Sequence, residues 1–300
     1  MSEYTLSHVS PTDKTTLAEI DALLQKEGIR RDGNLDYICA MFDEDYHVIG
    51  TGSCFGNTLR CFAVSSDHQG EGLLNQIITH LIEVQCARGN LHLFLYTKGK
   101  SSKFFGDLGF YEIARVEDTL VFMENRRDGF GAYLRGLEKT KTEGRSAALV
   151  MNANPFTLGH QYLVETAAAA CDTLHLFVVS EDASLVPFAV RKRLVAEGGR
   201  HLSNVVLHDS GPYIISNATF PSYFLKDSDT VIRSHAKLDI QVFLRIAQAL
   251  SLTDRFVGEE PFSQVTGIYN QVMAEELTAA GLGCNIIPRK ADEDGAISAS

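Results

Sequence analysis

Short apolar runs separated by polar turns dominate the first 125 residues and predict a sheet-rich domain. Two of these runs flank the polar turn at residues 43–45, as the strands of a hairpin would. Helical spacing of apolar positions predicts one helix over residues 14–28 and another after Gly72. The expected strands cover residues 37–41, 48–54, 59–64, 92–96 and 120–123.

From residue 146 onward, strand-like and helix-like segments alternate, which predicts a parallel sheet with helices on both faces. Residues 126–145 are rich in charge and glycine, so we expect a linker there, between domains at residues 1–125 and 146–300. The expected strands cover residues 147–151, 174–179, 205–208, 255–258 and 284–288, and the expected helices cover residues 159–170, 190–197, 238–250 and 265–280.

Charge and composition narrow the classes of partner. The chain of 300 residues has a formal net charge of −11, which disfavours nucleic acid and anionic membranes but allows a local basic pocket. Its six cysteines form no C-x-x-C pair, and the scattered histidines lack partners at helical metal-site spacing, so no metal site is predicted. Without a leader-like N-terminus or an apolar run of roughly 20 residues, a cytoplasmic protein with no membrane partner is expected.

The stretch with the clearest chemistry is VMNANPFTLGHQYL, residues 150–163, where a buried strand leads through a turn into a helix. Thr157 and His160 are three residues apart near the helix start, so both side chains can point the same way. Gly159 lets a ligand approach the backbone, and the free N–H groups of the new helix suit a phosphate. The alternative is a capped helix with a surface histidine.

This T-x-G-H stretch resembles the H/T-x-G-H signature of the nucleotidyltransferase superfamily. The resemblance implies that Thr157 and His160 contact the phosphates of ATP, with Gly159 beside them. Asn152 and Asn154 are candidates for further ATP contacts at the strand end, although Asn154 alternatively only shapes the turn.

Two more segments resemble parts of the same superfamily. Phe188 and Arg193 match an F-x-x-x-x-R helix start, where Arg193 either binds the nucleotide or is a plain surface charge. The last residues resemble a second motif, I-S-S/A-S/T-x-x-R, which places Ser298 and Ser300 at the triphosphate. The sequence stops before that motif's arginine, so we expect a truncated chain or an absent arginine.

The first domain resembles the GCN5-related N-acetyltransferase (GNAT) fold. Gln69, Gly70 and Gly72 match the family's R/Q-G-x-G turn, which binds the diphosphate of coenzyme A through backbone N–H groups. Two departures stand out: Leu74 replaces a small residue, and Phe105 stands where the family often has a tyrosine acid. A retained binding pocket without amine acetylation is therefore the expectation.

The chain resembles the citrate lyase ligase family over nearly its whole length. The resemblance rests on the motifs above together with two further stretches, FVGEEPF at residues 256–262 and the T-x-x-Y-N spacing at residues 266–270. The resemblance implies a ligase that adenylates acetate with ATP and Mg²⁺. It would then acetylate the thiol of the dephospho-coenzyme A-derived prosthetic group on the acyl-carrier subunit of citrate lyase. Two alternatives stay open: an adenylyltransferase acting on a coenzyme precursor, and an acetyl-CoA-binding sensor or acetyltransferase.

Overall fold

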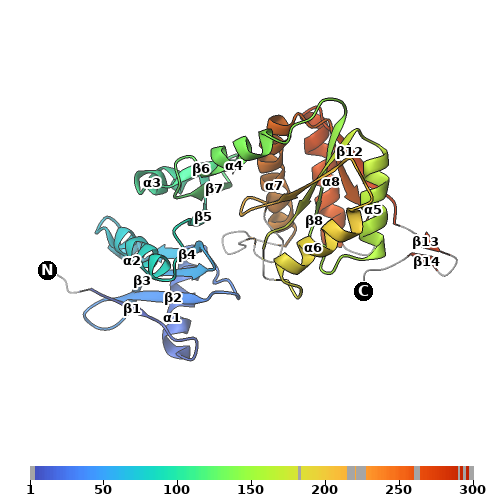
Figure 1. Cartoon of the computed structure of the whole chain (residues 1–300). Coiled ribbons are helices and arrows are strands. Elements are labelled where there is room, and N and C mark those ends of the chain that lie inside the picture. Colours follow the sequence, from blue (N-terminus) through green and yellow to red (C-terminus); the bar gives the residue numbers. More distant parts are fainter. Residues whose placement is uncertain are drawn as a thin grey trace. The chain divides into compact units, whose positions relative to one another are not determined.

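The structure, a computed structural model, divides into two compact units (Figure 1). One unit is built mainly from residues up to Gly129 and the other mainly from residues after it. The structure describes residues 4–181, 184–214, 220, 228–259, 264–289, 291–292 and 295–296.

The first unit is a mixed sheet with helices packed on it. Its seven strands lie in the order β1-β2-β3-β4-β5-β7-β6, and every neighbouring pair is antiparallel except β4 and β5. The strands are β1 (Thr5–His8), β2 (Tyr37–Phe42), β3 (Val48–Phe55), β4 (Thr58–Val64), β5 (Phe94–Thr97), β6 (Tyr111–Val116) and β7 (Leu120–Glu124). The helices are α1 (Lys14–Lys26), α2 (Leu73–Ala87) and α3 (Ser102–Asp107), with 3-10 turns η1 (Ser66–His68) and η2 (Gly99–Ser101).

Helix α2 covers one face of this sheet with a fully buried apolar stripe. Leu73, Ile77 and Leu81 lie on the stripe at helical spacing and pack in the same core as Leu59 and Leu95 of the sheet. A Cβ on Gly52 of β3 would overlap Ile77, so the strand and the helix approach closely only because that position is glycine. The glycine turn that precedes α2 is thereby held beyond the carboxyl end of β4, in the middle of the sheet.

The parallel strands β4 and β5 pair only at one end. Their register joins Thr58 to Phe94 and Leu59 to Leu95, and no pair follows in the remaining residues of β4. Beyond Leu59 the two strands therefore separate, and their side chains border an opening instead of a closed sheet.

The second unit contains a parallel sheet in the order β10-β9-β8-β11-β12. This arrangement confirms the parallel sheet expected from the alternating pattern. Its strands are β8 (Ser146–Met151), β9 (Thr173–Val178), β10 (Val205–Asp209), β11 (Asp254–Gly258) and β12 (Gly283–Ile287), with a small hairpin of β13 (Ala291–Asp292) and β14 (Gly295–Ala296). Its helices are α4 (Gly129–Glu138), α5 (Leu158–Ala169), α6 (Phe188–Gly199), α7 (Ser228–Leu250) and α8 (Gln264–Ala279).

Neighbouring side chains on β11 show how the helices divide between the sheet faces. Phe256 packs in the core that contains Val164 of α5. Arg255 points to the other face, where its Nη2 donates to Asp239 of α7 at 3.1 Å, and Tyr269 of α8 donates to the same carboxylate at 2.5 Å. Helices therefore cover both faces, as the pattern predicted.

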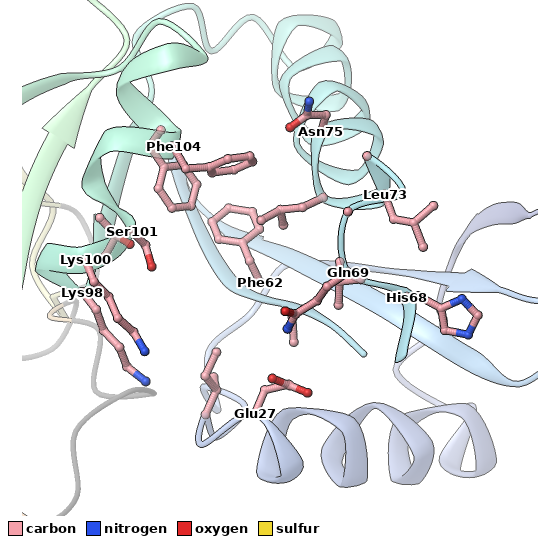
Figure 2. Close-up of a pocket in the computed structure, with 18 of the residues that line it drawn as sticks. Glu27, Phe62, His68, Gln69, Leu73, Asn75, Lys98, Lys100, Ser101 and Phe104 are labelled. Atoms are coloured by element: carbon pink, nitrogen blue, oxygen red, sulfur yellow. The ribbon is translucent and has the colours of Figure 1, made fainter. Parts of the chain in front are cut away.

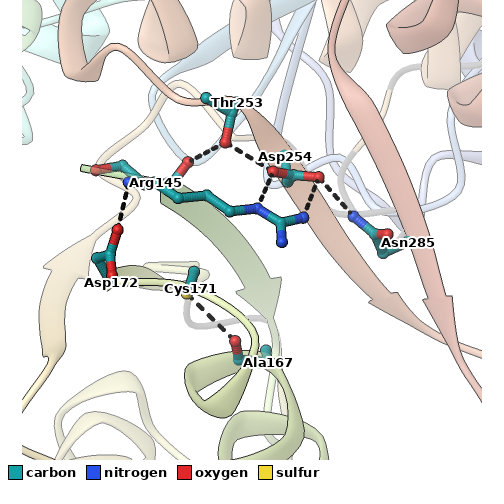
Figure 3. Close-up of polar contacts among 8 residues, drawn as sticks. Arg145, Ala167, Cys171, Asp172, Thr253, Asp254 and Asn285 are labelled. Carbon is teal, nitrogen blue, oxygen red and sulfur yellow. Dashed lines mark hydrogen bonds and ion pairs between the residues drawn. The ribbon is translucent and has the colours of Figure 1, made fainter.

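At the amino ends of the strands, a polar cluster joins β8 to β11 (Figure 3). Arg145 donates from Nε and Nη2 to the two carboxylate oxygens of Asp254 at 2.9 and 3.0 Å, and Thr253 and Asn285 also donate to that carboxylate. These donors hold the pKa of Asp254 at about 2, with the bond from Arg145 as the largest cause. The cluster fixes the register of the central strands at the edge opposite the predicted ligand site.

Three elements of the first unit were not predicted from the sequence pattern: β1, α3 and β6. In the second unit, α7 begins at Ser228 and not near residue 238, where the apolar periodicity first becomes clear. Ser298 and Ser300 lie outside the described residues. Within the part of the chain that is described, no helix is long and apolar enough to cross a bilayer.

Candidate functional site

The T-x-G-H turn lies at the carboxyl end of β8, the central strand of the parallel sheet. After Met151 the chain turns through Ala153, whose φ is +50°, and a cis Asn154–Pro155 peptide before α5 begins at Leu158. Ala153 is almost fully buried, so its left-handed backbone is held by the surrounding core. The strand end and the helix start are thus joined by a tight turn that is partly buried in the core.

Thr157 and His160 form a capping box at the N-terminus of α5. The backbone N–H of Thr157 donates to Nδ1 of His160 at 3.2 Å, and Oγ1 of Thr157 lies 2.8 Å from the same nitrogen. Since Nδ1 accepts, the neutral imidazole carries its proton on Nε2, which leaves a donor for a ligand. Burial lowers the pKa of His160 below its ordinary value, and this favours the neutral ring.

Two contacts show which side of the turn is packed and which is open. The Phe156 ring packs against α6 so closely that a Cβ on Gly198 would overlap it. A Cβ on Gly159 would meet only Oγ1 of Thr157, at 3.7 Å. The first turn of α5 therefore has room for a ligand beside Gly159, next to N–H groups that the helix does not use.

Asn152 and Asn154 hold a neighbouring loop in place. Nδ2 of Asn152 donates to Oγ of Ser184 at 3.1 Å, and Oδ1 of Asn154 accepts from the backbone N–H of Val186 at 2.9 Å. Both amides, which were predicted as ATP contacts, thus have a structural partner in residues 184–186, which we call the rim segment. Their contact with a nucleotide stays a prediction.

The helix after the rim segment contains two arginines in different settings. Arg193, the residue singled out from the sequence, is 69% exposed and its Nε lies 3.9 Å from Glu197 of the same helix. Arg191 is fully buried and donates to oxygens of Asn152, Val179, Glu181 and Val186. The structure thus brings Arg191, and not Arg193, to the strand ends beside the T-x-G-H turn.

A separate cavity of about 640 Å³ lies in the first unit, where β4 and β5 separate (Figure 2). Gln69, Gly70 and Gly72 all line it, so the structure brings these three predicted residues together. Gly70 and Gly72 have φ values of +89° and +75°, which side chains other than glycine rarely adopt. Gly72 is the N-cap of α2 and provides no side-chain cap, which leaves the first N–H groups of the helix at the cavity.

Charged and aromatic side chains complete this cavity. Lys98 and Lys100 line it from a different wall than Gln69, and among the described residues neither lysine has an acidic partner. Phe105 lies in the apolar part of the lining, 5.7 Å from the ring of Phe62 between centroids. Leu74 lines the cavity without closing it. The cavity therefore combines a wall of helix N–H groups and lysines, which suits an anion, with an apolar wall whose phenylalanine has no proton to donate.

Comparison with known proteins identifies the family. Residues 146–300 match the family described as citrate lyase ligase C-terminal domain. The citrate (pro-3S)-lyase ligase of Klebsiella pneumoniae is 41% identical over 271 residues, which are 90% of this chain and 79% of that protein. The chain belongs to the citrate lyase ligase family. The Haemophilus influenzae enzyme of the same name is 38% identical over 296 residues, which are 96% of this chain and 88% of that protein.

The match to citrate lyase ligases extends through both units, so the chain is an enzyme of the ligase class. The expected α/β fold class is confirmed: a mixed α+β unit is followed by a parallel-sheet unit that matches the citrate lyase ligase C-terminal domain. Among solved structures, a GNAT-family acetyltransferase from Staphylococcus aureus covers 41% of this chain and 100% of its own chain, at 12% identity and a TM-score of 0.35.

Proposed function

We propose that this chain activates acetate with ATP and then acetylates the prosthetic-group thiol on the acyl-carrier subunit of citrate lyase, releasing AMP and pyrophosphate. The observation that carries the proposal is the start of α5. It combines an open position at Gly159, unused backbone N–H groups and a neutral His160 with a donor on Nε2. The activity named for the relatives, that of a ligase acting on citrate lyase, supports the same interpretation.

In the first step, a carboxylate oxygen of acetate attacks the α-phosphorus of ATP, and the bond to the bridging oxygen of pyrophosphate breaks. Negative charge builds up on the phosphoryl oxygens. His160 donates from Nε2 to one of them, while the N–H groups at the start of α5 face the others. Thr157 keeps His160 in the tautomer that can donate, because its N–H occupies Nδ1.

In the second step, the carrier thiolate attacks the carbonyl carbon of acetyl adenylate, a thioester bond forms and AMP leaves with the electron pair. This route needs no nucleophile from the protein. Mg²⁺, when bound with ATP, neutralises phosphate charge. The described part of the T-x-G-H turn offers amide and hydroxyl oxygens but no carboxylate, which fits an ion held chiefly by the phosphates and water.

The cavity of the first unit is proposed to hold the prosthetic arm of the carrier. An arm derived from dephospho-coenzyme A contains a diphosphate and an extended pantetheine chain. The Gly70–Gly72 turn, the start of α2 and the two lysines, Lys98 and Lys100, suit the diphosphate, and the phenylalanine-lined wall suits the chain. Phe105 has no titratable proton, so it cannot supply the acid that the acetyltransferase family often has at that position.

Acetate-dependent exchange of labelled pyrophosphate into ATP tests the adenylation step. The proposal expects exchange with acetate and none without it. Exchange that needs a coenzyme precursor in place of acetate would support an adenylyltransferase instead. No exchange with any acid, together with acetylation of amines from acetyl-CoA, would shift the activity to the first unit.

Gly72→Glu tests the arm site, and Gly89→Glu is its matched control. Both glycines have positive φ and open space around a new Cβ, so the two variants carry the same backbone strain, but only Gly72 lines the cavity. We expect Gly72→Glu to raise the KM for the carrier protein while exchange stays normal. If a folded Gly72→Glu variant acetylates the carrier with the same KM as Gly89→Glu, the arm binds elsewhere.

A further inference from the structure

Arg191 is the most extensively bonded side chain beside the T-x-G-H turn. It is fully buried, and its guanidinium donates to oxygens from three separate parts of the chain. Nη1 lies 2.8 Å from the carbonyl oxygen of Asn152, 2.9 Å from its Oδ1 and 2.8 Å from the carbonyl oxygen of Val179. Nε donates to the carbonyl oxygen of Val186 at 2.9 Å, and Nη2 donates to that of Glu181.

These contacts require the shape of a guanidinium. Its donors lie in one plane and point in fixed directions, so one side chain can bind oxygens on several sides at once. The acceptors come from the end of β8, the end of β9 and the rim segment that leads into α6. A lysine at position 191 would keep the charge, but its single nitrogen could not reach the same set of oxygens.

Arg191 also determines how Asn152 is oriented. With Oδ1 accepting from Arg191, the amide nitrogen of Asn152 points to Ser184, to which it donates at 3.1 Å. Asn154 binds the next part of the rim segment through the N–H of Val186. The rim segment is therefore bonded from both asparagines and from Arg191. Asn154 is three residues before Thr157, which begins the T-x-G-H box.

We propose that Arg191 is a positioning residue for the adenylation step: it fixes the rim segment and Asn152 as a preformed wall beside the phosphate site at the start of α5. This inference rests on the proposed function and deepens it by identifying the arginine on which the site geometry depends. Since reacting groups misplaced by about 1 Å can lose on the order of 100-fold in rate, loss of this wall should be seen in catalysis as well as in stability.

The test compares Arg191→Lys with Arg200→Lys, the same substitution at an exposed arginine that caps the carboxyl end of the same helix. Acetate-dependent ATP–pyrophosphate exchange is measured for kcat and KM, and hydrogen–deuterium exchange is followed at the Val186 amide, which donates to Asn154. For Arg191→Lys we expect kcat/KM for ATP to fall by on the order of 100-fold and the Val186 amide to exchange faster. Arg200→Lys should leave both unchanged, because Arg200 is exposed at the far end of the helix from the strand ends.

Two outcomes would overturn the proposal. One is a folded Arg191→Lys variant with wild-type kinetics and wild-type exchange at Val186. The other is a loss of activity with an unchanged rate of hydrogen–deuterium exchange at the Val186 amide, because Arg191 would then act directly and not through the rim segment.

If Arg191→Lys fails to fold, Asn154→Ala takes its place as a milder way to release the rim segment. An unchanged kcat/KM for ATP together with faster hydrogen–deuterium exchange at Val186 would equally overturn the proposal. If the wild-type enzyme shows no acetate-dependent exchange, the proposed function fails, while the hydrogen–deuterium measurement still tests whether Arg191 holds the rim segment.

Discussion

Replacing His160 by alanine removes two interactions whose sizes can be separated. The first is the capping contact with the N–H of Thr157, and the loss of a helix N-terminal cap typically costs about 1 kcal/mol of stability. The second is the proposed Nε2–H donor to the phosphoryl oxygens, and removal of one such donor typically costs roughly 100- to 1000-fold in rate, or about 3–4 kcal/mol. Catalysis should therefore suffer far more than folding.

His160→Gln separates the two effects experimentally. Glutamine at the third helical position can still accept from the N–H of Thr157, so the capping box is kept while the ring donor is lost. We expect both variants to melt within several degrees of the wild-type protein and both to lose on the order of 100-fold or more in acetate-dependent ATP–pyrophosphate exchange. A folded His160→Gln enzyme with wild-type exchange would show that the imidazole does no more than cap the helix.

Three further outcomes are expected. Gly159→Ala should stabilise the fold by about 0.5–1 kcal/mol, because a methyl group fits there, yet reduce exchange because it fills the space for phosphate. Burial lowers the pKa of His208 to about 4, and burial also lowers the pKa of His175, to which His208 is bonded. The shift at His208 means that roughly 3 kcal/mol of stability should be lost as pH drops from 6.5 to 4, because the unfolded chain then binds a proton that the folded protein does not. Asp254→Asn should cost about 1–2 kcal/mol at pH 7, since Arg145 is half exposed and solvent screens the pair.

Matched variants and urea unfolding check these three values. Gly267→Ala, at another open helical glycine, should stabilise the protein without affecting exchange. His208→Phe should flatten the acid-side fall in stability, whereas His201→Gln, at a half-exposed histidine, should not. The Asp254 contribution should disappear as pH falls from 3.8 towards 2, because a depressed carboxylate pKa stabilises only above that window. A pH profile that is the same in wild type and His208→Phe would contradict the assignment to the histidine pair.

Much of the second unit could be predicted because its signals are local. Apolar runs of strand length alternate with helical periods, and the turn at residues 152–157 carries its own punctuation, so β8, α5 and the pairing of Thr157 with His160 follow from nearby residues. The beginning of α7 could not be predicted from nearby residues. Its first turns lack the apolar periodicity that marks the rest of the helix.

The two arginines of α6 show what local sequence cannot predict. Arg191 and Arg193 are two positions apart, so on a helix they point about 200° away from each other, and spacing in the sequence does not say which one faces the strand ends. The pair of His175 and His208 is hidden for a related reason. They are 33 residues apart and meet only because β9 and β10 are parallel neighbours. Tertiary register, and not composition, makes these contacts.

The position of β8 in the middle of its sheet has a consequence for synthesis of the chain. One of its edges pairs with β9, which follows soon after, but the other pairs with β11, roughly 100 residues later. At about 5–20 residues per second, a ribosome needs several seconds or more to deliver β11 after β8 has been made. Throughout that interval an apolar strand, SAALVM, presents an open edge that can pair with other chains. The enzyme should therefore depend on chaperones during translation, and fragments that end before residue 254 should aggregate.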